Sequence, residues 1–262
     1  MAKTQKELAF LREHIIDGIW TQRFTELADQ HLDLADAETL LYINAGTGSH
    51  ALALDERFGE KTDIFALCET DEILAIARDK AAAVGSKVDF SRIRFENDAF
   101  DAVIADGSFI LTDEAEELIG DAVRLAKSGG RIAVFLPTAG SYGEIFSLLW
   151  EVLMDDADHS FDVEALIAGL HSTTRLEEIA KELGMTDVET QTANEIFEFQ
   201  DGAEFISAPL VQDILLPQWL SGLDVDAAEA AAERLAQLID KDAGTLSFRF
   251  SVKATLLTGK KA

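Results

Sequence analysis

Short apolar segments alternate with amphipathic segments through the first half of the chain. The apolar segments are brief and nearly continuous, as expected for strands with helices on both faces. They lie at residues 40–44, 62–69, 87–95, 100–106 and 131–137. The segments between them have helical periodicity and predict helices over residues 48–58, 71–84 and 112–127. This alternation with short connections predicts an α/β fold with a doubly wound, mostly parallel sheet.

The flanking parts of the chain predict helices and a closing strand pair. At the N-terminal end, spacings of three to five residues predict one or two amphipathic helices, with Leu8, Leu11, Ile15, Ile19 and Phe24 on the apolar face. Further along, helices are predicted within residues 141–184, 207–220 and 226–241, and extended segments at 186–199 and 245–260. The last segment alternates in period two, which places Leu246, Phe248, Phe250 and Val252 on one face. An antiparallel pair at the sheet edge is the expected result.

The chain has no segment that reads as a flexible linker, since it holds only three prolines and no Gly/Ser-rich run. We therefore expect one domain over residues 1–262. It would comprise a helical cap (1–37), a ligand-binding core (38–138) and a helical insert with edge strands (139–262).

The net charge and the cysteine content indicate which binding partners and which cellular compartment to expect. The formal net charge is −27, from 49 acids and 22 bases, so the surface would repel phosphate backbones and anionic membranes. Cys68 is the single cysteine and lies in an apolar run, which predicts a buried, inert thiol. The N-terminus lacks the apolar core of a signal peptide. We expect a cytoplasmic protein that binds neither nucleic acid nor membrane, with a homodimer or protein partner left open.

The candidate site lies where the predicted parallel strands end. Ligands of open α/β sheets bind beyond the carboxyl ends of the strands, here the turns after Asn44, Cys68, Phe90, Asp106 and Leu136. The first of these turns contains Gly46 and Gly48 and leads into a predicted helix. Glycine there either lets the backbone approach a ligand or serves only to pack a tight strand-to-helix turn.

Four segments in register resemble class I S-adenosylmethionine-dependent methyltransferases. They are LLYINAGTGSHALAL, ALCETDEILAIAR, FENDAFDAVIADGSFILTD and AVRLAKSGGRIAVFLP, within residues 38–138. The resemblance implies that S-adenosylmethionine is the cofactor and that its amino-acid end lies against the glycine turn. It also implies that Glu69 accepts hydrogen bonds from the ribose hydroxyls and that Asp106 lies beside the methyl group. The cofactor-binding residues implied in this way are Asn44, Ala45, Gly46, Gly48, Glu69, Thr70 and Asp106.

The sequence departs from the family pattern at three places. Tyr42 stands where an acid is usual, Asn44 stands where glycine is usual, and the segment between residues 90 and 95 is short where the adenine would bind. Asp89 or Ser91 could stand in for the missing adenine contact. Asn tolerates left-handed backbone better than most residues, so the turn can survive. These departures support an alternative: a catalytically inactive methyltransferase-like binding or scaffolding protein.

The sequence indicates fewer residues that could bind the methyl acceptor. Ser141, Tyr142 and Glu144 follow the fifth strand and either reach the acceptor or form a mobile turn. Phe146 and Trp150 have helical spacing, which favours a core position over a substrate cage. His50 is predicted to be a surface histidine rather than a general base. The glycines do not follow the spacing of a nicotinamide-dependent oxidoreductase. The leading hypothesis is methyl transfer to a small or medium-sized acceptor, with no catalytic residue identified and no metal expected.

Overall fold

A seven-stranded sheet forms the centre of the molecule. The computed structural model describes residues 3–262 except 33, 35, 111–113, 154–159 and 244–245. The strands are β1 (Thr39–Ile43), β2 (Asp63–Leu67), β3 (Asp89–Ser91), β4 (Phe100–Asp106), β5 (Ala126–Pro137), β6 (Met185–Phe199) and β7 (Phe248–Lys261), in the order β3-β2-β1-β4-β5-β7-β6. The first five are parallel, whereas β7 runs antiparallel to both β5 and β6. The predicted doubly wound sheet and its closing antiparallel pair are confirmed.

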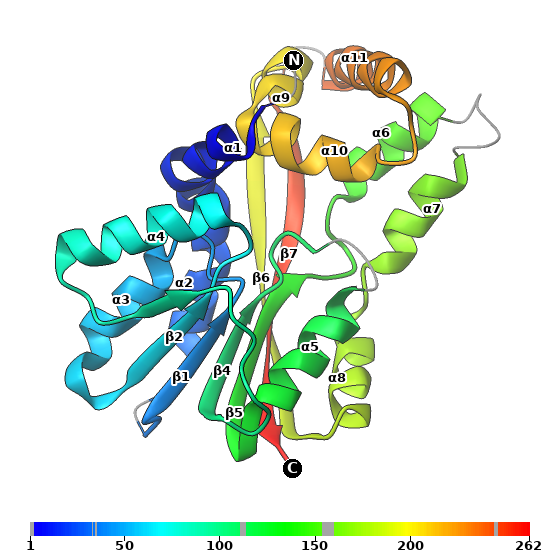
Figure 1. Cartoon of the computed structure of the whole chain (residues 1–262). Helices are drawn as coiled ribbons and strands as arrows, with labels where there is room; N and C mark the ends of the chain where they lie inside the picture. Colours follow the sequence, from blue (N-terminus) through cyan, green and yellow to red (C-terminus); the bar gives the residue numbers. More distant parts are fainter. Residues whose placement is uncertain (1–2, 33, 35, 111–113, 154–159, 244–245) are drawn as a thin grey trace.

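Helices cover both faces of the sheet and its carboxyl edge (Figure 1). The first half of the chain contributes α1 (Gln5–Leu11), the π-helical segment η1 (Arg12–Thr21), α2 (Gln22–His31), α3 (Ser49–Phe58), α4 (Asp71–Val84) and α5 (Glu114–Leu125). The second half contributes α6 (Gly143–Leu153), α7 (Ser160–Gly169), α8 (Thr173–Glu182), α9 (Gly202–Ser207), η3 (Val211–Leu215), α10 (Leu216–Trp219) and α11 (Val225–Ala243).

The strands supply alternate residues to two hydrophobic cores. From β1, Leu41 and Ile43 pack on the face covered by α5 and α8, while Leu40 and Tyr42 belong to the core beneath α2, α3 and α4. In Figure 1, α1, α9, α10 and α11 lie above the carboxyl ends of the parallel strands, so a helical layer covers the edge where ligands of such sheets bind.

The N-terminal helices differ from the sequence prediction over part of the face that they bury. Phe24 is fully buried as predicted, but Ile15 and Ile19, which were expected to be buried, are 37% and 42% exposed. Ile16 and Trp20 are fully buried instead. The cause is the π-helical geometry of η1, whose wider turn rotates the apolar face relative to an α-helix.

Other boundaries also differ. The helix predicted to end at residue 127 ends at Leu125, while its predicted first residues, 112 and 113, lie outside the described residues. β5 begins at Ala126 rather than at residue 131, with a register shift against β4. The strand predicted over 87–95 is only Asp89–Ser91. Leu246 precedes β7 and is exposed, whereas Phe248, Phe250 and Val252 share the core as predicted.

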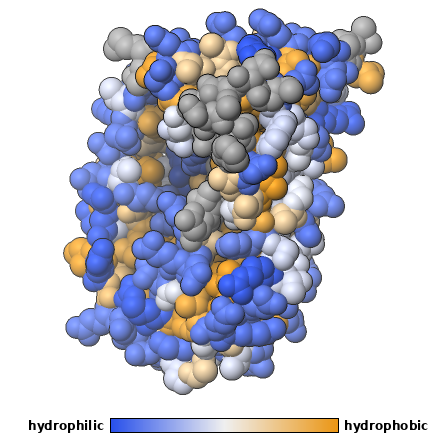
Figure 2. Space-filling model, turned by 90° about the vertical axis from the view of Figure 1, so that its right-hand side faces the viewer, coloured by the Kyte–Doolittle hydropathy of each residue, from blue (hydrophilic) through white to orange (hydrophobic). Residues whose placement is uncertain are grey.

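Polar side chains dominate the face of the molecule shown in Figure 2, with separate apolar areas between them. This distribution fits the large excess of acidic residues. In the parts of the chain that the structure describes, no helix has both the length and the apolar character needed to cross a bilayer.

Candidate functional site

The turn after β1 has the left-handed geometry that its sequence suggests. Asn44, Gly46 and Gly48 have φ angles of 56°, 54° and 84°. The Asn44 side chain donates a hydrogen bond to the backbone carbonyl of Asp106 (3.1 Å), and the Ala45 amide donates to the carbonyl of Leu67 (2.8 Å). The turn therefore survives the replacement of glycine by Asn44, and it ties together the carboxyl ends of three neighbouring strands.

The two glycines of this turn face different neighbours. A Cβ on Gly48 would lie 2.5 Å from the ring of Phe90, so glycine is required there for packing. A Cβ on Gly46 would lie 3.2 Å from Nη2 of Arg12, a flexible side chain. Packing against Phe90 therefore explains why position 48 is glycine. The backbone of Gly46 faces Arg12 of η1.

Glu69 and Thr70 follow β2, and their side chains make different contacts. The Thr70 hydroxyl accepts a hydrogen bond from the Ile73 amide (3.2 Å) and caps α4. One carboxylate oxygen of Glu69 lies 3.3 Å from Nη1 of Arg12. The other, Oε2, is buried without a hydrogen-bond partner in the described structure. A buried unpaired carboxylate oxygen is costly, and it fits a site that receives hydroxyl donors from a ligand.

Asp106 ends β4 and is almost fully buried, with 5% of its surface exposed. Its carboxylate accepts a hydrogen bond from the Ser108 amide (2.7 Å). Burial raises the pKa of Asp106 to about 6, although Arg12 and the Ser108 hydrogen bond oppose the rise. The negative charge there depends on a nearby cation, because an isolated buried carboxylate is strongly disfavoured.

These residues meet at one cavity beneath the N-terminal helix. It has a volume of about 310 Å³, within the range of small-molecule sites. Its wall contains four of the seven predicted cofactor residues, Asn44, Glu69, Thr70 and Asp106. Of the others, Ala45 and Gly46 line a second cavity, and Gly48 is packed against Phe90.

The N-terminal helix contributes residues that the sequence did not single out. The Thr47 hydroxyl is hydrogen-bonded to Glu13 and to Asp17 (2.7 Å), and Lys80 pairs with Glu13 (2.6 Å). Arg12 lies inside the site, with its guanidinium 4.2 Å from the centre of the Phe109 ring. No motif marks Arg12, Glu13 and Asp17, since η1 is far from the glycine turn in sequence.

Trp20 contacts both the segment that follows β4 and the loop that follows β5. Its indole N–H donates to the carbonyl of Ser108 (3.1 Å), and its ring stacks near Tyr142, with the ring centres 6.3 Å apart. Tyr142 has a φ of 61°, an unusual conformation for a bulky residue that occurs preferentially at functional sites. Its hydroxyl is buried and has no hydrogen-bond partner in the described structure.

The other two predicted acceptor residues are occupied by structural hydrogen bonds. The Ser141 hydroxyl donates to the carbonyl of Thr138 (2.7 Å), and Glu144 accepts from the hydroxyl of Ser251 (2.9 Å). Of the three, only Tyr142 keeps an unpaired polar atom pointing into the protein.

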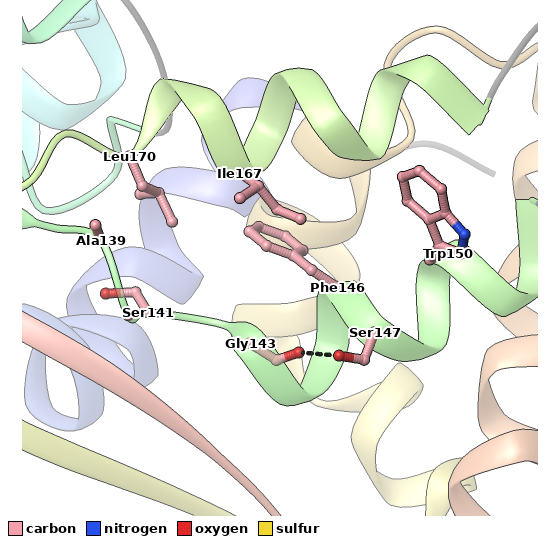
Figure 3. A pocket seen from close by; sticks show the side chains of 9 residues that line it. Ala139, Ser141, Gly143, Phe146, Ser147, Trp150, Ile167 and Leu170 are labelled. Carbon is pink, nitrogen blue, oxygen red and sulfur yellow. Dashed lines mark hydrogen bonds between the residues drawn. The ribbon is translucent and has the colours of Figure 1, made fainter.

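An apolar cavity of about 420 Å³ opens beside this loop, between α6 and α7 (Figure 3). Its wall includes the large apolar side chains of Phe146, Trp150, Ile167 and Leu170. Phe146 is buried, as a core position requires, but Trp150 is 39% exposed. The prediction that both aromatic residues belong to the core is therefore right for Phe146 and wrong for Trp150.

His50 and Tyr42 form a partly buried polar pair. The Tyr42 hydroxyl lies 3.0 Å from Nδ1 of His50, and the Nε2 atom of His50 lies 3.3 Å from Asp29. The His50 side chain is only 10% exposed, so the predicted surface histidine is wrong. Tyr42, which stands where an acid is usual in the family, contacts α3 through His50.

Cys68 is buried as predicted, and burial raises the pKa of its thiol to about 12.

Comparison with known proteins agrees with this geometry. A family model described as a methyltransferase domain matches residues 41–134, which hold the glycine turn, Glu69 and Asp106. The chain carries a methyltransferase domain of the class I S-adenosylmethionine-dependent superfamily. The match covers most of the segment from β1 to β5 and excludes most of the helical layer.

Relatives of this methyltransferase domain cover different parts of the chain. A demethylmenaquinone methyltransferase of Thermus thermophilus is 31% identical over 140 residues, which are 50% of this chain and 61% of that protein. The YcgJ protein of Bacillus subtilis shares the fold with a TM-score of 0.59 and 15% identity, over 92% of this chain and 98% of its own.

A phosphoethanolamine N-methyltransferase 2 from Haemonchus contortus, solved with phosphomonomethylethanolamine and S-adenosylhomocysteine, has a TM-score of 0.57 and 16% identity. The likeness covers 98% of this chain and 58% of that protein. At this level of identity the solved structures show a shared fold alone.

Proposed function

We propose that this protein is an S-adenosylmethionine-dependent methyltransferase acting on a small or medium-sized acceptor. The observation that carries the proposal is the convergence of Asn44, Glu69 and Asp106 on one cavity. They come from the carboxyl ends of three adjacent strands, and the unpaired Oε2 of Glu69 is available to ribose hydroxyls.

The cofactor would supply an electrophilic methyl group on a sulfonium. The protein's own part is to orient and to exclude water. Glu69 would fix the ribose, the turn at Gly46 would receive the amino-acid end, and Asp106 would place negative charge near the cation. Holding donor and acceptor in line is the main source of acceleration in such a reaction.

The acceptor would lie toward Trp20 and Tyr142, under the helical layer. The aromatic side chains packed there favour an acceptor with an apolar body, and the unpaired Tyr142 hydroxyl supports a polar contact with it. The relative from Thermus thermophilus, whose name gives demethylmenaquinone as its substrate, is consistent with an acceptor of this kind. The acidic composition and the single thiol fit a cytoplasmic enzyme of small molecules rather than of nucleic acid.

The test is formation of S-adenosylhomocysteine by the purified protein, followed by mass spectrometry. S-adenosylmethionine would be supplied with a panel of quinol, phenol, amine and carboxylate acceptors. We expect turnover with at least one apolar acceptor and none with Gly46→Val, whose branched side chain would enter the cofactor turn. Cofactor binding with no turnover on any acceptor would contradict the proposal and favour a binding protein.

A further inference from the structure

Arg12 reaches into the centre of the cofactor side from the N-terminal helix. Its Nη1 lies 3.3 Å from Glu69, its Nε lies 3.3 Å from Asp17, and its guanidinium covers the ring of Phe109. Only 12% of the side chain is exposed. Arg12 and Asp17 are five residues apart, one turn of the π-helical segment, so this unusual geometry places both side chains on the inner face.

The same guanidinium contacts two of the features assigned to the cofactor. It pairs with the carboxylate of Glu69, which is the expected acceptor for the ribose hydroxyls. It also fills the space beside Gly46, where the missing Cβ leaves the backbone open. A ligand that uses Glu69 and the open backbone of Gly46 must therefore compete with Arg12 for the same surface.

The charges around Arg12 decide which ligands can compete. Four acids, Glu13, Asp17, Glu69 and Asp106, surround the site, and Lys80 is paired with Glu13. Moving the guanidinium away leaves Glu69 and Asp106 in a partly dry cavity without their cation, which is costly. A cation that enters offsets this cost, and a neutral group does not.

We propose that Arg12 holds the place of the positive charge of S-adenosylmethionine in the ligand-free site and is released from Glu69 when the cofactor binds. The acids that Arg12 leaves then favour the sulfonium over the uncharged thioether of S-adenosylhomocysteine. The inference rests on the proposed function, because it assumes that S-adenosylmethionine enters this cavity. It assigns to Arg12 the role of a competing internal cation, and it requires α1 and η1 to move when the cofactor binds.

The exchange has a thermodynamic basis. A ligand shifts a conformational equilibrium only by its differential affinity for the two states. The sulfonium and ammonium of S-adenosylmethionine outweigh its carboxylate by one charge, whereas S-adenosylhomocysteine carries no net charge. The product would therefore leave Glu69 and Asp106 less well neutralised, and return of Arg12 would favour its release.

The test is calorimetric titration of wild type and Arg12→Met with S-adenosylmethionine and S-adenosylhomocysteine. Met keeps most of the stem and removes the competing cation. We expect Arg12→Met to bind S-adenosylmethionine at least tenfold more tightly, with a smaller gain for S-adenosylhomocysteine. Weaker or unchanged binding of S-adenosylmethionine by Arg12→Met would overturn the inference, because it would mean that Arg12 holds the cofactor or does not meet it.

A second measurement uses the unaltered protein, in case Arg12→Met does not fold. Amide hydrogen exchange in residues 5–21 should become faster when S-adenosylmethionine binds, since Arg12 leaves Glu69, and should change less with S-adenosylhomocysteine. Protection of this segment by S-adenosylmethionine would overturn the inference while leaving the proposed function intact. No binding heat and no exchange response in wild type would overturn both.

Discussion

Phe90 occupies the space into which any side chain at position 48 would project. Its Cζ lies 2.5 Å from the position of a Cβ on Gly48, and Phe90 itself is only 2% exposed. The glycine turn is thus locked to β3 by packing, and the ring cannot move aside without opening the core.

Gly48→Ala should therefore lower the free energy of unfolding by roughly 3 kcal/mol or more, from a left-handed backbone and steric overlap together. Gly85→Ala is the matched control, because Gly85 also has a positive φ, of 68°, but has open space around it. It should cost only about 1 kcal/mol. Urea denaturation measures both, and equal losses would contradict the packing role of Phe90.

Asp106 should make stability depend on pH. Its pKa in the folded protein is about 6, above the ordinary value of 3.8, so folding is favoured by protonation of this group. Its contribution to stability is fully present below pH 3.8 and falls as the pH rises toward 6, by roughly 3 kcal/mol.

Asp106→Asn removes that titration and keeps an acceptor for the Ser108 amide. Its melting temperature relative to wild type should rise between pH 4 and 6.5 and stay constant above pH 7. A difference independent of pH across this range would show that Asp106 is not the titrating group.

Two buried tyrosines should respond in opposite ways to loss of the hydroxyl. Tyr42→Phe loses the bond to His50 and should cost about 1 kcal/mol. Tyr142→Phe removes a buried hydroxyl without a partner and should leave stability unchanged or raise it by about 1 kcal/mol. Thermal unfolding compares the two, and a clear loss of stability in Tyr142→Phe would reveal a partner that the structure does not show.

Thr47 should hold the N-terminal helix on the cofactor turn. Thr47→Val removes the hydrogen bonds to Glu13 and Asp17, so amide exchange in residues 5–21 should become faster in the ligand-free protein. Thr62→Val is the control, because it removes a buried hydrogen bond to the carbonyl of Ala37 away from this helix. If both variants change exchange in residues 5–21 equally, the effect comes from lost global stability.

The sheet could be predicted because its signals are local. Apolar runs and helix caps such as Thr70 are encoded within a few residues, and α4 begins and ends as predicted, at Asp71 and Val84. The tolerance of Asn for left-handed backbone also predicted that the turn would survive at Asn44.

The rest of the site depends on contacts between distant segments. Arg12 and Glu69 meet only after η1 packs over the sheet. The spacing of apolar residues also placed Ile15 and Ile19 on the buried face, which is wrong because η1 is π-helical. The packing role of Gly48 depends on Phe90, which lies on another strand. No local pattern records these relationships.

Calorimetric titration of the purified protein with S-adenosylmethionine decides whether Glu69 and the turn after β1 bind this cofactor. We expect micromolar binding by wild type and by Glu60→Gln, whose carboxylate is exposed and paired with Lys87. Glu69→Gln should bind at least tenfold more weakly, because one of the two acceptor oxygens becomes a donor. Equal binding by Glu69→Gln, or no heat and no thermal shift with wild type at millimolar cofactor, would show that S-adenosylmethionine does not bind at Glu69.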